Sequence, residues 1–203
     1  MAKVALIGAS GNAGSRILKE LSDRGHQVTA IARNPEKIAQ LPGVTAVKGD
    51  AQDGAALAEL LRGHDAVVSA TRFTGTDFSI IADALGKAGV ARYLVVGGAA
   101  SLEVAPGQRL LDQPNFPDAY KEEATNGAAT LDYLRGLDDL EWTFLSPSAM
   151  FVPGERTGSF RLGKDQLLSN ENGSSISFED YAIAMVDEIE APKHIRRRFT
   201  VGY

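Results

Sequence analysis

The chain has 203 residues, 44% of them hydrophobic, which is enough to bury the core of one compact α/β domain. Its formal net charge of -5 offers no basic field for nucleic acid or anionic lipid, so we expect neither partner, and no membrane association. The lack of cysteine excludes disulfides, thiolate nucleophiles and cysteine-ligated zinc or iron–sulfur clusters. Because neither a leader nor an apolar run of about 18 residues is found, we predict a single cytoplasmic domain over 1–203.

Short apolar runs rich in β-branched residues recur along the first three quarters of the chain, and we expect each to be a strand buried on both faces. These runs are 4–7, 28–31, 44–47, 66–68, 93–96 and 142–145. Between them, apolar residues return at helical spacing, first at Ile17, Leu18 and Leu21, and then within 57–61, 80–85 and 124–134. This alternation predicts βαβ units and a parallel sheet with helices on both faces.

Helix signals and turns complete the pattern. Asn34-Pro35 has the form of a cap followed by proline at the first position of a helix, and Ser177 to Asp180 form a capping box before the last amphipathic helix. Residues of about 151–176 contain two glycine turn signals and no strong period, so we expect an irregular excursion on the substrate side, suited to a lid. The closing run 198–203 is expected to form an edge strand.

A glycine-rich turn follows the first predicted strand and consists of Gly8, Ala9, Ser10, Gly11, Asn12, Ala13 and Gly14. Three glycines at a strand-to-helix junction permit a tight turn, close approach of backbone to a pyrophosphate, and close helix–sheet packing. The helix N-terminus then faces the phosphates with its free N–H groups. We expect a dinucleotide here; the alternative is a turn that needs glycine only for packing.

The residue at the end of the second strand indicates which dinucleotide binds. Arg33 stands there, about 20 residues after Gly14, where an acidic residue would bond the ribose of NAD. Its guanidinium suits the 2′-phosphate of NADP, and Lys37 adds a second charge, so we prefer NADP(H) and keep NAD(H) possible. In the alternative, both are ordinary solvated charges. Asp50, assigned to adenine, and Ala70-Thr71 follow the third and fourth strands and complete the expected cofactor site.

These motifs resemble a known family, the atypical short-chain dehydrogenase/reductases of the NAD(P)H-binding, NmrA-like kind, and within it the bacterial proteins described as NADH-flavin reductases. The resemblance rests on residues 5–14, 32–35, 49–50, 96–101, 145–147 and 199–203. It implies a Rossmann-type doubly wound sheet of strand order 3-2-1-4-5-6, with a small C-terminal substrate region. It also implies that Ser101 and Pro147 lie near the nicotinamide.

One departure from the family pattern concerns proton transfer. Typical short-chain dehydrogenases pair a tyrosine with a lysine four positions later, but Tyr120 is followed there by Ala124. Lys121 is adjacent and points about 100° away on a helix, so it cannot replace that lysine. His26 and His64 are expected in turns at the opposite edge of the sheet, and His194 in a polar connection without metal-ligand spacing. The basic triplet 196–198 beside it is expected to be a solvated strand entry.

The remaining candidates near the nicotinamide are Ser101 and Tyr120 as catalytic groups, with Phe73 and Phe151 as substrate contacts. Such a site can stack a flat acceptor but supplies little proton transfer, which favours hydride transfer to FMN, FAD or a quinone. In the alternatives, Ser101 is a turn residue and Tyr120 a packing residue, or the protein is a non-catalytic NADP(H) sensor. We expect a monomer or homodimer that acts on a small molecule, with no metal.

Overall fold

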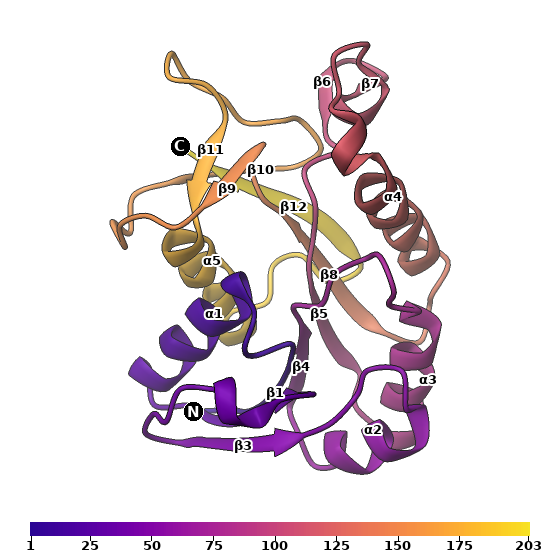
Figure 1. Cartoon of the computed structure of the whole chain (residues 1–203), viewed down its shortest axis with the longest axis vertical. Coiled ribbons are helices and arrows are strands. Elements are labelled where there is room, and N and C mark those ends of the chain that lie inside the picture. Colours follow the sequence, from indigo (N-terminus) through magenta and orange to yellow (C-terminus); the bar gives the residue numbers. More distant parts are fainter.

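One eight-stranded sheet forms the centre of the molecule in the computed structural model, which describes residues 1–203 (Figure 1). In spatial order the strands are β3 (Val44–Lys48), β2 (Gln27–Ala32), β1 (Lys3–Ile7), β4 (Ala66–Ser69), β5 (Arg92–Val96), β8 (Glu141–Ser146), β12 (Arg197–Gly202) and β10 (Arg161–Gly163). All neighbouring pairs are parallel except β10 with β12. The predicted Rossmann-type fold and the strand order implied by the resemblance are both confirmed.

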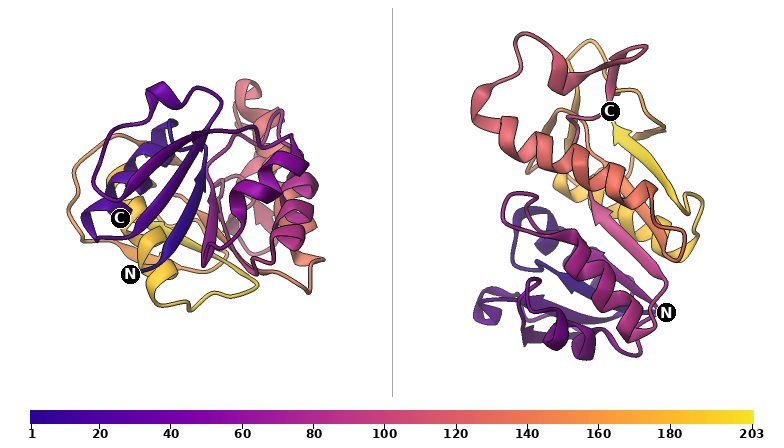
Figure 2. Two further views of the ribbon diagram at one scale, coloured as in Figure 1. Left: turned by 90° about the horizontal axis from the view of Figure 1, so that it is seen from below. Right: turned by 90° about the vertical axis from the view of Figure 1, so that its right-hand side faces the viewer.

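Helices cover both faces of this sheet (Figures 1 and 2). Helices α1 (Asn12–Asp23) and α5 (Phe178–Glu190) lie on one face, and α2 (Gly54–Leu61), α3 (Phe78–Ala88) and α4 (Lys121–Arg135) on the other. Side chains alternate along β1, so that Leu6 joins the core under α1 and α5 while Ile7 joins the core under the other three helices. The central strands are therefore buried on both faces, as predicted.

Side-chain caps begin three of the helices. Asp53 accepts a hydrogen bond from the N–H of Ala56 at 3.2 Å, and Asp77 from that of Ser79 at 2.9 Å. The predicted cap of α5 is confirmed by Ser177 Oγ, which accepts from the Asp180 N–H at 3.0 Å. The other half of the predicted box does not form, because the Asp180 carboxylate turns to a neighbouring segment.

Three expectations about local structure are wrong. Strand β3 is an edge strand in which no residue is fully buried, because no strand pairs with its outer side. The helix expected after Asn34 does begin at Pro35 but is a single 3-10 turn, Pro35–Lys37. The last strand, β12, is interior, because β10 pairs with its outer side. β10 belongs to the excursion that we expected to be irregular, and three residues are too few to show a period.

Two small sheets extend beyond the carboxyl ends of the main strands. β9 (Met150–Val152) pairs with β11 (Ser175–Ser177) within the excursion, and β6 (Glu103–Ala105) pairs with β7 (Gln108–Arg109) between β5 and α4. The 3-10 turns Leu110–Asp112 and Asp118–Tyr120 connect the second pair to α4. Figure 1 shows the two small sheets on either side of the upper end of the molecule.

None of the helices combines the length and the apolar character that crossing a membrane requires. We retain one domain as our proposal, because the central sheet takes strands from Lys3 near one end of the chain to Gly202 near the other.

Candidate functional site

The glycine turn joins β1 to α1, and two of its glycines touch backbone atoms. Gly8 has φ +81°, and a Cβ there would lie 2.6 Å from the carbonyl oxygen of Ala70. A Cβ on Gly14 would lie 2.2 Å from the carbonyl oxygen of Gly8. A side chain at position 14 would push α1 away from β1, and a side chain at position 8 would push β1 away from β4. The turn is therefore as close to the sheet as the backbone allows.

The N-terminus of α1 is open to a ligand. Its N-cap is Gly11, so no side chain caps the first turn, and this turn contains no acidic residue. Ser10, Gly11 and Asn12 are exposed, whereas Ala9 is buried in the core and can present only its backbone. Free N–H groups at the positive end of a helix suit a phosphate. The residues present therefore fit the pyrophosphate of a dinucleotide.

The other predicted cofactor residues lie at the same edge of the sheet. Arg33 directly follows β2 and, like Lys37, is exposed. Asp50 follows β3, and one of its carboxylate oxygens already accepts the N–H of Gln52 at 2.9 Å. Beside the turn, the Ala70 N–H donates to Ile7 O at 2.8 Å, and the buried hydroxyl of Thr71 has no hydrogen-bond partner in the protein. An unpaired buried hydroxyl is costly unless a ligand satisfies it.

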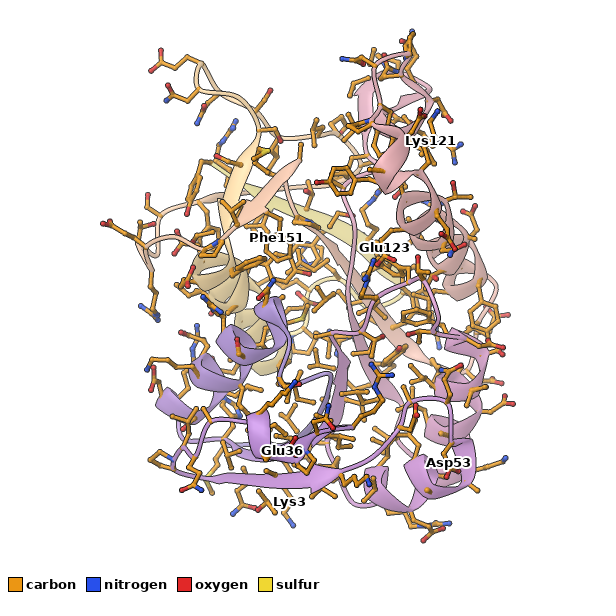
Figure 3. The ribbon with its side chains drawn as sticks, in the orientation of Figure 1. Lys3, Glu36, Asp53, Lys121, Glu123 and Phe151 are labelled. Carbon is orange, nitrogen blue, oxygen red and sulfur yellow. The ribbon has the colours of Figure 1, made fainter.

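A cavity of about 680 Å³ lies beyond the carboxyl ends of β5 and β8. It contains five residues that the sequence analysis assigned to the nicotinamide and the acceptor, namely Phe73, Ser101, Tyr120, Pro147 and Phe151. Its walls come from residues 97–117, from α4 and from residues 147–152. In Figure 3, Phe151 on β9 and Glu123 on α4 lie on opposite sides of this region. Open α/β sheets bind ligands at this end of their strands.

Ser101 is held by a cation that the sequence analysis placed in solvent. Arg198 Nη1 donates to Ser101 Oγ at 3.1 Å, and the same guanidinium pairs with Asp165 at 2.7 Å. The Arg198 side chain is buried, which contradicts the expectation of a solvated triplet for this residue. It lies in β12, and its guanidinium is enclosed between Asp165 and the backbone and hydroxyl of Ser101. The Ser101 hydroxyl is therefore a positioned group of the cavity wall.

Tyr120 lies just before α4, and its side chain is 66% exposed at the mouth of the cavity. Ala124, one helical turn later, lines the cavity where a lysine would be needed to lower the tyrosine pKa. Lys121 pairs with Asp118 at 2.6 Å and does not line the cavity. The geometry thus agrees with the prediction that Lys121 cannot replace that lysine.

Glu123, which no sequence pattern singled out, lines the cavity from α4. Its two carboxylate oxygens accept the N–H groups of Phe73 and Thr74, each at 2.7 Å. Burial opposes ionisation, but these hydrogen bonds prevail and lower the pKa of Glu123 below its ordinary value. The carboxylate therefore stays charged and fixes the loop that carries Phe73. No local motif points to it, since the contact joins residues about 50 positions apart.

Tyr181 is a second residue that the sequence did not identify. Its hydroxyl donates to Leu145 O at 2.6 Å and accepts the Gly97 N–H at 3.3 Å, so it joins the ends of β5 and β8 beneath the cavity. The ring of Phe151 packs on Tyr181 and on Phe178, with centroids 4.6 and 4.5 Å apart. Burial raises the pKa of Tyr181 well above its ordinary value. This hydroxyl is therefore a fixed structural donor.

The histidines lie away from the cavity. His26 Nε2 contacts Glu190 at 2.9 Å, and His64 Nε2 contacts Thr29 Oγ1 at 2.7 Å. His194 Nδ1 contacts the buried Glu188 at 2.8 Å, and its ring stacks on Phe199. His26 and His64 precede β2 and β4, as predicted, and His194 lies in the polar connection between α5 and β12, where it contacts the buried Glu188. No group of histidine, aspartate and glutamate side chains has a metal-binding arrangement.

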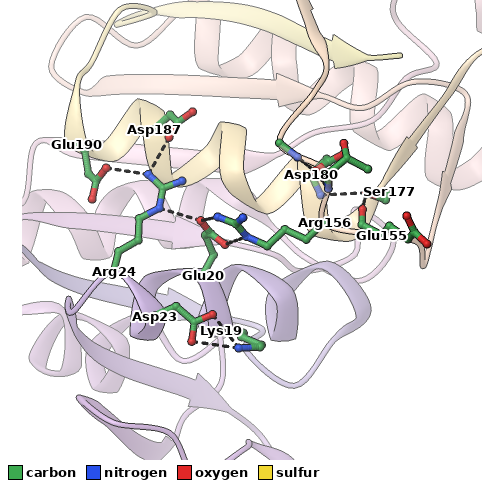
Figure 4. Close-up of polar contacts among 12 residues, drawn as sticks. Lys19, Glu20, Asp23, Arg24, Glu155, Arg156, Ser177, Asp180, Asp187 and Glu190 are labelled. Carbon is green, nitrogen blue, oxygen red and sulfur yellow. Dashed lines mark hydrogen bonds and ion pairs between the residues drawn. The ribbon is translucent and has the colours of Figure 1, made fainter.

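Residues 153–160, which we call the strap, contradict the expected lid. Arg156 donates to Glu20 on α1 through two contacts of 2.8 Å, and the N–H groups of Thr157 and Gly158 donate to the buried Asp180 at 2.8 Å (Figure 4). Of the whole excursion, only Phe151 and Val152 line the cavity. The strap lies against α1 and α5 instead, because three carboxylates of these helices, including Glu179 on Gly154, bind it.

Comparisons with known proteins agree with this geometry. The family described as "NAD(P)H-binding" matches residues 8–192. The uncharacterized protein YwnB of Bacillus subtilis (strain 168) is 45% identical over 98% of this chain and 97% of that protein. A Bacteroides thetaiotaomicron structure described as a "putative epimerase" is 43% identical, covers 100% of this chain and 97% of its own, and superposes with a TM-score of 0.95.

A Streptococcus pneumoniae TIGR4 structure described as a "putative NADH-flavin reductase" is 38% identical, covers 100% of this chain and 99% of its own, and superposes with a TM-score of 0.83. The activities in these descriptions differ, so the descriptions agree on the fold and family and not on one reaction. The family match over residues 8–192 covers the glycine turn, both core layers and the cavity. The chain therefore belongs to the NAD(P)H-binding family, whose relatives are oxidoreductase-like, as the resemblance predicted.

Proposed function

We propose that this protein transfers hydride from NADPH to a flat acceptor, a flavin or a quinone-like compound. The observation that carries the proposal is the composition of the cavity wall. Phe73, Phe116 and Phe151 line it, and its only titratable groups are Tyr120 and Glu123. A wall of this kind can stack and orient a ring but has little capacity for acid–base work.

The reaction balances without a proton relay in the wall. Bound NADPH supplies a hydride, which carries two electrons and one proton, and the acceptor takes a second proton from water; the products are NADP⁺ and the two-electron-reduced acceptor. The task of the protein is then to hold both partners. In this proposal the glycine turn binds the pyrophosphate, Ser101 and Pro147 lie against the nicotinamide, and Phe73 and Phe151 contact the acceptor.

The preference for NADPH rests on Arg33. It is exposed directly after β2, and Lys37 is exposed in the 3-10 turn that follows. A guanidinium and an ammonium at this edge of the sheet favour a 2′-phosphate over a free hydroxyl.

A second candidate function is cofactor sensing without catalysis, and Ala124 is the observation that favours it. The residue that would activate Tyr120 is missing, and Tyr120 is largely exposed. In that case the protein binds NADP(H) and signals the cofactor concentration to another molecule.

Turnover separates the two functions. Purified protein is mixed with NADPH or NADH and with FMN, FAD, benzoquinones and aldehydes, and oxidation is followed at 340 nm. We expect saturable oxidation of NADPH with flavins or quinones and none with aldehydes. Tight NADPH binding without turnover of any acceptor would contradict the reductase and support the sensor.

The Tyr120→Phe variant tests whether Tyr120 donates a proton in the reaction. We expect kcat to change less than about threefold, because removing a true proton donor costs roughly 100-fold or more. A loss of that larger size would show that Tyr120 transfers a proton, and the acceptor class would then have to include carbonyl compounds.

A further inference from the structure

We infer that the preferred acceptor is an uncharged quinone carrying an apolar side chain, rather than a phosphorylated flavin. The inference rests on the proposed function and narrows its acceptor. It follows from the charges in the cavity wall and from the apolar side chains at the mouth.

No lysine, arginine or histidine lines the cavity, and its one charged side chain is negative. Glu123 is fixed in place by the two N–H donors of Phe73 and Thr74, so it cannot turn away from an incoming ligand. A phosphate of FMN or FAD would enter a cavity that offers it a carboxylate and no cation. Like charges in a partly buried site disfavour binding.

The nearby cations are not part of the cavity wall. Arg198, behind Ser101, is buried and pairs with Asp165 at 2.7 Å, and Lys121 pairs with Asp118 at 2.6 Å outside the lining. Arg72, 3.9 Å from the carboxylate of Glu123, is solvent-exposed and also outside the lining. A phosphate inside the cavity would therefore meet no cation of the wall.

Apolar side chains stand exposed on two sides of the cavity mouth. Tyr120, before α4, is 66% exposed, and Met150 and Val152 on β9 are 59% and 41% exposed. Met150 and Val152 stand two residues apart on one strand, so their side chains share a face, and both line the cavity. The ring of a quinone would stack within the aromatic walls, and a hydrocarbon chain attached to it would leave across Met150 and Val152.

Two pairs of acceptors isolate these two features. The quinones are coenzyme Q0 and coenzyme Q1, which share a ring and differ by one isoprenyl unit. The flavins are riboflavin and FMN, which differ by one phosphate. With saturating NADPH, we expect kcat/KM to be roughly tenfold higher for Q1 than for Q0, the effect of burying about two methylene groups. We also expect kcat/KM to be higher for riboflavin than for FMN.

Variants test the named residues. Met150→Ser combined with Val152→Ser should bring the Q1 to Q0 ratio close to one, whereas Leu162→Ser, on an equally exposed leucine outside the cavity, should leave it unchanged. Val152→Lys adds the missing cation and should raise kcat/KM for FMN relative to riboflavin, while Leu162→Lys should not.

The outcomes are distinct. Equal kcat/KM for Q1 and Q0, or FMN superior to riboflavin in the unmodified protein, would overturn this inference and leave the reductase proposal standing. NADPH oxidation with none of the four acceptors would overturn both. If the double serine variant still prefers Q1 to Q0, the isoprenyl chain binds elsewhere, and the assignment of Met150 and Val152 as its contact surface is refuted.

Discussion

Two carbonyl oxygens determine which residues the glycine turn accepts. The oxygen of Ala70 occupies the space of a side chain at position 8, and the oxygen of Gly8 occupies the space of one at position 14. The sequence predicted a tight strand-to-helix turn here, because glycines spaced three apart directly follow a strand pattern. It could not show that the carbonyl facing Gly8 belongs to Ala70, directly after β4, a contact between residues about 60 positions apart.

Gly14→Ala should therefore destabilise the fold and remove NADPH binding. The Cβ would overlap a backbone oxygen, so α1 must move, and we expect a loss of about 2 kcal/mol or more in the free energy of unfolding. Gly86→Ala is the matched control, because it lies within α3 with no atom near its Cβ position. It should stabilise by about 0.5–1 kcal/mol. Urea unfolding and NADPH titration measure both; equal stability of the two variants would refute this account.

Arg33→Glu should weaken NADPH binding far more than NADH binding. The new carboxylate would repel a 2′-phosphate but could accept a hydrogen bond from the 2′-hydroxyl of NAD. Removing the charge-assisted contact should cost NADPH roughly 1.5–3 kcal/mol, or about 10-fold to 100-fold in Kd. Lys87→Glu, the same charge change at the far end of α3, controls for net charge. If both dinucleotides lose affinity equally, Arg33 does not recognise the phosphate.

At the scale of elements, the strap connects the two functional regions. It continues from β9, which lines the cavity, and binds to α1, whose N-terminus is the proposed phosphate site. Glu20 is the centre of this connection, since it pairs with Arg24 and Arg156 while its side chain is almost fully buried. The hydrogen bonds from Arg156 and, less strongly, from Arg24 lower the pKa of Glu20 despite its burial.

This connection should make stability depend on pH. A carboxyl whose pKa is lower in the folded state stabilises the fold above its unfolded pKa, and that stabilisation is lost as the pH falls through the folded pKa. Glu20→Gln should thus lower Tm at pH 7 and flatten the fall of Tm from about pH 5 downward. Glu59→Gln breaks an exposed pair with Arg62 and should have little effect on Tm at pH 7 or on the fall of Tm at lower pH. A parallel fall of Tm in Glu20→Gln and the unmodified protein would contradict this role.

Sequence patterns predicted the elements that depend on nearby residues and failed for very short strands and distant contacts. The parallel strands and the cap of Ser177 were predicted because each depends on neighbours within a few residues. Strands of three residues, such as β9, β10 and β11, are too short for a period, and so the excursion was predicted as irregular. Glu123, Tyr181 and Arg198 act through partners 36 to 97 residues away, which no local pattern encodes.

In the whole molecule, the proposed cofactor and acceptor sites come from different stretches of chain at one edge of one sheet. The glycine turn and Arg33 follow the first two strands, whereas most of the cavity is built from residues 97–152. The sheet order reverses at β1, where β2 and β4 lie on opposite sides, and this reversal opens the crevice for the dinucleotide.

NADPH should accordingly stabilise the whole fold. At a concentration 100 times its Kd, a ligand that binds only the folded state adds about 2.7 kcal/mol. For a chain of this size, Tm should rise by roughly 5–10 °C. Differential scanning fluorimetry with NADPH measures the shift, and the Gly14→Ala variant should show none. A shift that persists in this variant would place the cofactor elsewhere.

The interior position of β12 has a consequence for synthesis on the ribosome. β12 is the last strand of the sheet to be translated, yet it lies between β8 and β10 and carries the guanidinium that holds Ser101. Until it emerges, β8 has an unpaired edge, while β1 to β5 with the glycine turn can already pair. The glycine turn and the residues that line the cavity are thus translated before the guanidinium that positions Ser101, and the period of greatest aggregation risk is the wait for residues 197–202.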